Sequence, residues 1–228
     1  MNFKEGEVIV IDKPYNWTSF DVVSKVKKYV RKSYDYKEKI KVGHAGTLDP
    51  LATGIMIICT GRKTKEIDKY MADEKEYVAT IRVGATTPSF DCETLIDKEF
   101  PFDHITEQLV KETLNQFIGE FEQMPPRYSA KKIDGQPAYL KAREGKHVEV
   151  KPALVNIKEI ELLEFTLPVV KIKIVCGKGT YIRSLAHDLG KALNSGAYLT
   201  DLTRTRVGTY TLSQAFKIED LEKYLTTA

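Results

Sequence analysis

The stretch KVGHAGTLDPLATGIMIICTG, residues 41–61, places a single carboxylate in an unusual setting. Pro50 restricts Asp49 to an extended backbone, and Gly46 and Gly54 allow the chain to turn tightly or to approach another surface closely. An aspartate in a turn commonly hydrogen-bonds its own backbone, and spacing alone slightly favours this reading. The alternative is a carboxylate that is held in position to act on a substrate.

A second charged residue also breaks a local rule. Gly177 and Gly179 precede an apolar helical pattern that begins near Thr180, so Arg183 falls in the first turn of the predicted helix. The helix dipole is positive at this end and disfavours a cation there. Such violations often mark functional sites. An inward Arg183 would form a positive pocket for a carboxylate, and Asp49 is a candidate occupant.

Other familiar sites do not fit the sequence. The glycines near residues 61 and 177 lack the spacing of a phosphate-binding loop. The four histidines have no metal-ligand spacing, and three cysteines far apart favour neither a disulfide framework nor a zinc site, which is typical of a reducing cytoplasm. We therefore expect no metal site. No apolar run is long enough to span a bilayer.

The apolar pattern predicts an α+β fold with a largely antiparallel sheet in one domain. A helix is expected from a Thr18 or Ser19 cap, with apolar residues from Phe20 to Val30, and Gly119 should end another. The predicted strands are 8–11, 55–59, 77–83, 154–165, 169–176 and 203–212, and the predicted helices are 18–30, 105–117, 180–193 and a short terminal one.

Positive charge is concentrated in two blocks. Residues 25–41 hold eight basic and two acidic residues, and residues 124–151 hold seven basic and three acidic ones, whereas the whole chain carries a net charge of only +3. Charge runs are usually solvated surfaces. Two basic blocks on an otherwise acidic body favour a polyanionic partner instead.

Several separated motifs, taken together, resemble the TruB family of bacterial tRNA pseudouridine synthases, which isomerise uridine 55 in the T-loop of tRNA. The resemblance covers nearly the whole chain and rests most strongly on GHAGTLDPLATG at residues 43–54. Further matches are IDKP at 11–14, YSA at 128–130, KGTYIR at 178–183 and LTRT at 202–205. It implies a pseudouridine-synthase-like fold, a mixed sheet flanked by helices and RNA-binding loops.

The resemblance assigns roles to residues that pattern alone would not select. Asp49 would be the catalytic carboxylate and Arg183 its ion-pair partner, while Tyr77 would stack on the target base. Strand periodicity alone would make Tyr77 a core residue. Substrate contacts are further implied for His44, Tyr181, Leu202 and Asp91, and RNA contacts for Lys13, Arg127, Lys131 and Lys132.

Some features depart from the family pattern. Ala45 replaces a more usual threonine, and Pro88 replaces a residue that is often aspartate. Residues 124–151 match an RNA-gripping insertion. The chain ends at Ala228, from which we expect one catalytic domain, residues 1–228, without the C-terminal PUA domain of many members.

The implied reaction breaks the glycosidic bond of uridine, rotates the base and forms a carbon–carbon bond. It is redox-neutral, so we expect neither cofactor nor metal. Asp49 could attack the sugar, attack the uracil ring or assist a glycal route, and the sequence does not separate these. Each route needs an ionised carboxylate, which Arg183 would favour against the effect of burial.

Two alternatives stay open at this point. One is the guide-RNA-dependent synthase of archaea and eukaryotes, although Leu51-Ala52 and the short C-terminus favour the bacterial type. The other is a tRNA-folding chaperone with secondary catalysis. The expected partner is the T-arm stem-loop of tRNA, and we expect a cytoplasmic monomer that needs no protein partner.

Overall fold

The computed structural model describes residues 2–126, 128, 132–133, 136–137 and 151–223. The chain forms two compact units. Unit 1 comprises Met1–Tyr77 and Thr203–Ala228, and unit 2 is Val78–Leu202. Two long strands, β4 (Lys75–Val83) and β12 (Ala197–Val207), each begin in one unit and end in the other.

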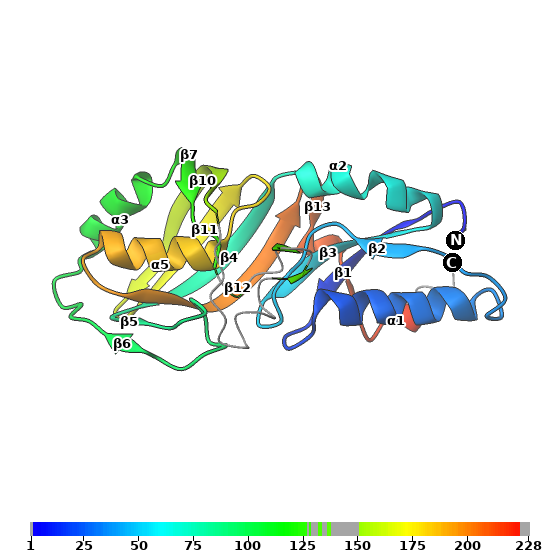
Figure 1. Ribbon diagram of the computed structural model, residues 1–228, viewed down its shortest axis with the longest axis horizontal. Coiled ribbons are helices and arrows are strands. Elements are labelled where there is room, and N and C mark those ends of the chain that lie inside the picture. The colour runs from blue at the N-terminus through cyan, green and yellow to red at the C-terminus, as the bar shows by residue number, and fades with distance from the viewer. Residues whose placement is uncertain (1, 127, 129–131, 134–135, 138–150, 224–228) are drawn as a thin grey trace. The chain divides into compact units, whose positions relative to one another are not determined.

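Unit 1 contains a sheet in the order β14-β1-β3-β12 (Figure 1). β1 (Val8–Lys13) pairs antiparallel with β3 (Thr53–Thr60) and parallel with β14 (Phe216–Lys217). β12 pairs parallel with β3, through Thr203–Thr53 and Arg204–Gly54. Two short strands complete the sheet: β2 (Val42–His44) lies on β3, and β13 (Tyr210–Thr211) lies on β12.

Both faces of β3 are covered. Ile55, Ile57 and Cys59 belong to an apolar cluster with Tyr70 of α2 (Ile67–Ala72), which follows a 3-10 turn, η1 (Gly61–Glu66). The alternate residues Met56 and Ile58 are fully buried as well. A continuous apolar run is typical of such a strand. The predicted buried strand at 55–59 is therefore confirmed.

Helix α1 (Ser19–Lys32) packs against β2. Thr18 is its N-cap and forms a capping box with Asp21, as the sequence predicted. Val22, Val26 and Val30 form its fully buried stripe. The prediction that Phe20 shares this apolar face is wrong. Phe20 is 74% exposed, because it lies outside the i, i+4, i+8 spacing of the three valines.

Unit 2 has the strand order β12-β4-β11-β10-β7. β11 (Val169–Cys176) and β7 (Gly119–Gln123) both pair antiparallel with β10 (Ala153–Thr166). Helix α3 (Glu107–Asn115) packs against β10 and against α5 (Ile182–Ala192), as Figure 1 shows. Alternate residues of β4, from Tyr77 to Val83, are buried, which confirms the predicted strand face.

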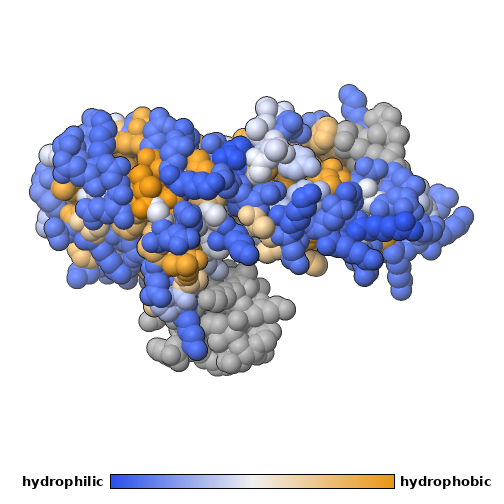
Figure 2. Space-filling view, turned by 90° about the horizontal axis from the view of Figure 1, so that it is seen from above, coloured by the Kyte–Doolittle hydropathy of each residue, from blue (hydrophilic) through white to orange (hydrophobic). Residues whose placement is uncertain are grey.

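The remaining elements are short. β5 (Ala85–Thr86) pairs with β6 (Lys98–Glu99), β8 (Lys132–Ile133) pairs with β9 (Gln136–Pro137), and η2 (Leu212–Gln214) follows β13. Antiparallel pairs predominate in both units, so the α+β prediction is confirmed. In the view of Figure 2, hydrophilic side chains cover most of the visible face of each unit. No helix in the described residues is long and apolar enough to cross a membrane.

Candidate functional site

Asp49 lies in the loop that joins β2 to β3 in unit 1. The amide of Ala45 donates to the carbonyl of Ile57 at the start of this loop, and the amide of Ala52 donates to the carbonyl of Asp49 at its end. Leu48 is fixed to α1, because its amide donates to Ser19 Oγ at 2.9 Å and its carbonyl accepts from that hydroxyl at 3.0 Å. Asp49 is half-buried, and hydrogen bonds fix the backbone of its loop at several points.

The ammonium of Lys13 ties the same loop to the end of β1. Lys13 Nζ donates to the carbonyls of Trp17 at 2.7 Å, Pro14 at 2.9 Å and Pro50 at 3.2 Å. The side chain is completely buried. Its charge satisfies three backbone carbonyls next to Asp49, and the predicted contact of Lys13 with RNA stays a prediction. A buried ammonium that is fully hydrogen-bonded holds these segments together.

Arg204 of β12 holds the other side of the loop. Its guanidinium donates to the carbonyls of Ile55 at 2.8 Å, Gly46 at 3.3 Å and Thr47 at 3.5 Å. Gly54 has φ +102°, and a Cβ there would lie 2.3 Å from the carbonyl oxygen of Arg204. The close approach of β3 to β12 therefore requires glycine.

The charges around the loop influence one another. Burial lowers the pKa of Lys13 to about 8, and the nearby carboxylate of Asp49 opposes this shift. Arg204 adds to the lowering. The pKa of His44 is also lowered, mainly by burial, and its Nδ1 has no hydrogen-bond partner among the described residues. His44 is therefore a neutral ring at the start of the Asp49 loop near pH 7.

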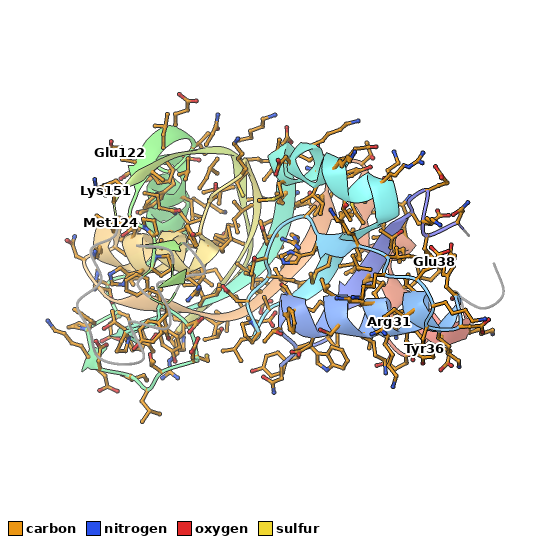
Figure 3. All side chains as sticks on the ribbon, turned by 45° about the vertical axis from the view of Figure 1, so that its right-hand side comes forward. Arg31, Tyr36, Glu38, Glu122, Met124 and Lys151 are labelled. Atoms are coloured by element: carbon orange, nitrogen blue, oxygen red, sulfur yellow. The ribbon has the colours of Figure 1, made fainter. Side chains whose placement is uncertain are left out.

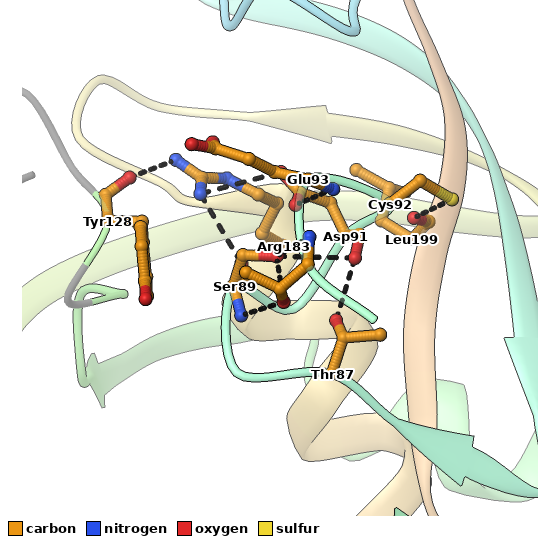
Figure 4. Close-up of polar contacts among 9 residues, drawn as sticks. Thr87, Ser89, Asp91, Cys92, Glu93, Tyr128, Arg183 and Leu199 are labelled. Atoms are coloured by element: carbon orange, nitrogen blue, oxygen red, sulfur yellow. Dashed lines mark hydrogen bonds and ion pairs between the residues drawn. The ribbon is translucent and has the colours of Figure 1, made fainter. Parts of the chain in front are cut away.

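Unit 2 holds a second polar cluster, around Arg183 in the first turn of α5 (Figure 4). Arg183 Nη1 lies 3.5 Å from Asp91 Oδ2 and 3.3 Å from the carbonyl of Ser89, and Nη2 donates to the carbonyl of Tyr128 at 2.8 Å. Arg183 is 3% and Asp91 5% exposed. The two carbonyl acceptors add hydrogen bonds to the guanidinium, which a buried pair of this kind needs to offset its desolvation.

The loop that carries Asp91 is built from local hydrogen bonds. Thr87 Oγ1 and Ser89 Oγ donate to the carbonyl of Asp91, and Asp91 Oδ1 accepts from the amide of Glu93 at 2.9 Å. Phe90 adopts φ +64°, a backbone region that residues other than glycine rarely occupy. Its ring stacks on His187 of α5, with centroids 3.8 Å apart and planes inclined by 12°.

His187 is four residues after Arg183, so the two side chains share one side of α5. The pKa of His187 is lowered to about 4, chiefly by burial and then by Lys191. The stacked ring is therefore neutral and adds no positive charge near Arg183. One face of α5 thus supplies both Arg183, which pairs with Asp91, and His187, whose ring packs on Phe90.

The three residues predicted to line the base pocket each lie on a defined helix or strand. Tyr181 is the N-cap residue of α5, and its amide and carbonyl both bond to the side chain of Gln123, at 2.8 and 3.1 Å. Leu202 of β12 is 6% exposed and Tyr77 of β4 is 9% exposed. These positions do not test their predicted contacts with a base, which stay predictions.

The structure brings Asp91 and Arg183 together, whereas Asp49 belongs to unit 1 and Arg183 to unit 2. The predicted ion pair between Asp49 and Arg183 therefore stays a prediction. Arg127 and Lys131 lie outside the described residues, and Lys132 is described only by its backbone in β8. Among the described residues, no group of histidine, cysteine and acidic side chains could hold a metal ion.

Sequence reasoning missed Arg204 and the positional role of Lys13. Arg204 stands two residues after Leu202, on the buried side of β12, and a charged residue at an apolar strand position was the available signal. Lys13 gave a weaker signal. Its partners Trp17 and Pro50 come from separate segments, so nothing in the local pattern predicts burial.

The fold is similar to that of chains in solved complexes. The chain aligns with a TM-score of 0.74 and 28% identity to a structure entitled "Crystal Structure of a Cbf5-Nop10-Gar1 Complex", covering 98% of this chain. It aligns with a TM-score of 0.70 and 26% identity to one of an H/ACA RNP bound to a substrate RNA containing 2'-deoxyuridine, covering 97% of this chain. It spans about 55% and 54% of those two chains. This fold and the family models below define the class as pseudouridylate synthases, which are isomerases.

Sequence comparisons give the family. A family model described as TruB family pseudouridylate synthase (N terminal domain) matches residues 31–182, and one described as tRNA pseudouridylate synthase B C-terminal domain matches residues 183–228. Proteins named tRNA pseudouridine synthase B are similar over nearly the whole chain. One from Phocaeicola vulgatus is 57% identical over 99% of this chain and 95% of its own length, and one from Bacteroides fragilis is 58% identical over 94% and 91%. The chain belongs to the TruB family of pseudouridylate synthases. The predicted single domain over residues 1–228 and the absence of a PUA domain stay predictions.

Proposed function

We propose that this protein converts uridine 55 in the T-loop of tRNA to pseudouridine, with Asp49 as the catalytic carboxylate. The observation that carries the proposal is the loop GHAGTLDPLATG, in which Lys13, Ser19 and Arg204 fix the backbone on both sides of Asp49. Several relatives that are 53–58% identical over at least 94% of this chain are named tRNA pseudouridine synthase B, which supports tRNA as the substrate. We further propose that the enzyme acts as a monomer in the cytoplasm and recognises the T-arm.

The reaction exchanges one bond for another within the same nucleotide. The bond between N1 of uracil and C1′ of ribose breaks, the base rotates, and C5 bonds to C1′ while its proton is lost and N1 becomes protonated. No electrons are gained or lost. Asp49 acts as a nucleophile, on the ribose or on the ring, or assists a glycal route. The target base must first leave its stack, at a cost of a few kcal/mol.

The other predicted residues have supporting roles in this proposal. Tyr77 stacks on the flipped base, Tyr181 and Leu202 line its pocket, and His44 meets the RNA where the base leaves its stack. Stacking on an aromatic ring offsets part of the cost of extrusion. Asp91 contacts the substrate, and Arg183 acts as the ion-pair partner of Asp49. Arg127, Lys131 and Lys132 bind the RNA backbone.

The deciding experiment maps pseudouridine in unmodified tRNA after incubation with the purified protein, without cofactor or guide RNA. We expect modification at position 55 by the wild type and none by Asp49→Asn, which keeps the side-chain shape and removes the nucleophile. The Asn variant should still bind tRNA. Retention of a tenth of the wild-type rate, a barrier change of only about 1.4 kcal/mol, would contradict the role of Asp49.

A guide-RNA-dependent synthase is the second candidate, because the fold resembles that of the Cbf5-containing complex. The 57% identity to a tRNA pseudouridine synthase B over nearly both full lengths outweighs that likeness at 28% identity. A requirement for added guide RNA would favour this candidate. A tRNA-folding role is tested separately, by comparing wild type and Asp49→Asn in a tRNA-refolding assay.

A further inference from the structure

An open groove of about 470 Å³ lies at the N-terminal half of α1. Asn16 and Trp17, which precede the helix, line it together with four residues of the helix: Asp21, Ser24, Lys25 and Lys28. These helical residues are spaced by three and four, so they lie on one face. That face is distinct from the buried stripe of Val22, Val26 and Val30.

The residues that line the groove carry a net positive charge, from Lys25 and Lys28 against Asp21. Helix α1 has five basic residues and one acidic residue. Toward its C-terminal end, Lys32 pairs with Glu222 at 2.8 Å, and Arg31 lies over the ring of Tyr36 at 5.7 Å (Figure 3). Among the described residues, no carboxylate lies within ion-pair distance of Lys25 or Lys28, while Lys25 lies 5.5 Å from the ring centroid of Tyr29.

Asp21 offsets part of this charge, but its carboxylate is turned to the residue before the helix. Its carboxylate accepts from the amide of Thr18 at 2.9 Å and from the hydroxyl of Thr18 at 2.6 Å. These two bonds lower the pKa of Asp21, and the bond from the hydroxyl has the larger effect. The negative charge is thus held at the helix N-terminus, where the dipole favours it.

The groove is joined directly to the loop of Asp49. Lys13 Nζ bonds to the carbonyl of Trp17 and to that of Pro50, and the amide of Asn16 donates to Pro50 at 2.9 Å. Trp17 therefore shares an ammonium partner with the residue that follows Asp49. The Trp17 end of the groove is thus linked through one side chain to the loop that would hold the target nucleotide.

We propose that the groove binds a nucleotide that flanks the target in the substrate RNA. Lys25 and Lys28 meet its phosphates, and the half-buried indole of Trp17 provides a surface for its base. Asn16, Ser24 and Asp21 can bond to base edges or to the ribose 2′-hydroxyl. A lining that combines two lysines with an indole suits single-stranded nucleic acid better than an acidic peptide, which would leave the indole without a partner. The inference rests on the proposed function and extends it to a second subsite.

Trp17 is the one tryptophan in the sequence, so its fluorescence reports on the groove directly. Titration of the wild-type protein with a T-arm stem-loop should quench this fluorescence at the concentrations that support modification. Replacing Lys25 and Lys28 together by alanine should raise the Kd and KM about tenfold with little change in kcat. Two lost phosphate contacts should also reduce the slope of log affinity against log salt by about 1.4 to 1.8.

A double variant of equal charge provides the control. Lys69→Ala with Lys217→Ala removes two exposed lysines of unit 1 that do not line the groove, and should change the Kd less than twofold. Trp17→Ala should weaken binding about tenfold, and Trp17→Phe should restore part of the loss. Circular dichroism of each variant checks folding.

The outcomes separate the two proposals. Pseudouridine formation with unchanged Trp17 fluorescence and equal Kd for both double variants would overturn the subsite and leave the enzyme function intact. Quenching by RNA without pseudouridine formation by the wild type would overturn the function and support nucleotide binding in the groove.

Discussion

At the scale of single residues, the loop of Asp49 is positioned by two buried cations that bond to its backbone. Lys13 and Arg204 donate to carbonyls on either side of the aspartate. Carbonyl dipoles compensate both charges, and the nearby carboxylate of Asp49 further compensates that of Lys13. The loop geometry is thus set before any substrate is bound, which is the preorganisation that catalysis needs.

The substitution Arg183→Lys tests whether the planar guanidinium group of Arg183 is needed for activity. Arg183 reaches Asp91, Ser89 and Tyr128 in three directions, and an ammonium cannot reproduce that geometry. We expect kcat/KM to fall at least a hundredfold, while the variant folds and still binds tRNA. Single-turnover assays and thermal melting measure the two effects. Turnover near that of the wild type would show that the planar group has no catalytic importance.

His187 predicts a pH effect on stability. Its pKa is about 4 in the folded protein and 6.5 in the unfolded chain, so the unfolded chain binds more protons between these values. The stability from this group is complete above pH 6.5 and is lost as pH falls toward 4. Since the ring is half-buried, we expect a loss of about 2 kcal/mol at pH 4.5.

The control for that measurement is His187→Phe, which keeps a ring against Phe90 and has no proton to bind. Urea denaturation between pH 7 and pH 4.5 should show a smaller loss of stability for the variant than for the wild type. Parallel curves for the two proteins would contradict the buried, neutral histidine.

At the scale of elements, the approach of β3 to β12 depends on one glycine. Gly54→Ala should lower the free energy of unfolding by about 3 kcal/mol or more, because the added Cβ meets the backbone of Arg204 and the positive φ is strained. Gly119→Ala is the matched control. Gly119 has φ +106° with nothing within 4 Å of its Cβ position, so it should cost only about 1–2 kcal/mol. Equal losses would show that the clash is relieved.

Most elements were predictable from local pattern, and the exceptions have physical causes. The alternation of apolar residues predicted β4, which is buried on one face, and the continuous apolar run predicted β3, which is buried on both. β12 begins at Ala197 and not at residue 203, since Ala197, Tyr198 and Leu199 are consecutively buried and show no alternation. The predicted strand 203–212 is also interrupted, because Gly208 turns the chain from β12 into β13.

The site was predictable only in part. Arg183 stood out because it violates the helix dipole, and the structure confirms its place in the first turn of α5. Its observed partner Asp91 is 92 positions away along the chain, and no local rule connects them. The stack of Phe90 on His187 was not predicted either, because an aromatic residue with positive φ gives no periodic signal.

At the scale of the whole molecule, the proposed contacts of His44, Tyr77, Tyr181 and Leu202 all concern a flipped base and its immediate loop. RNA loops are recognised by shape and splayed bases, so a short hairpin presents most of what these residues could contact. We expect an isolated T-arm stem-loop to be modified with a kcat/KM within about tenfold of that of full-length tRNA, or about 1.4 kcal/mol. Steady-state kinetics on both RNAs measure the ratio. A stem-loop that is worse by several orders of magnitude would mean that distant tRNA contacts dominate.

The division of the chain has a consequence for the order in which the protein is made. Unit 2 is one continuous stretch, Val78–Leu202, whereas unit 1 needs strands from both ends of the sequence. A ribosome therefore completes every residue of unit 2 before it adds Arg204. Until then the loop of Asp49 lacks its guanidinium contacts and β3 lacks its partner β12. We expect the growing chain to be inactive until Arg204 has been added and β12 has paired with β3.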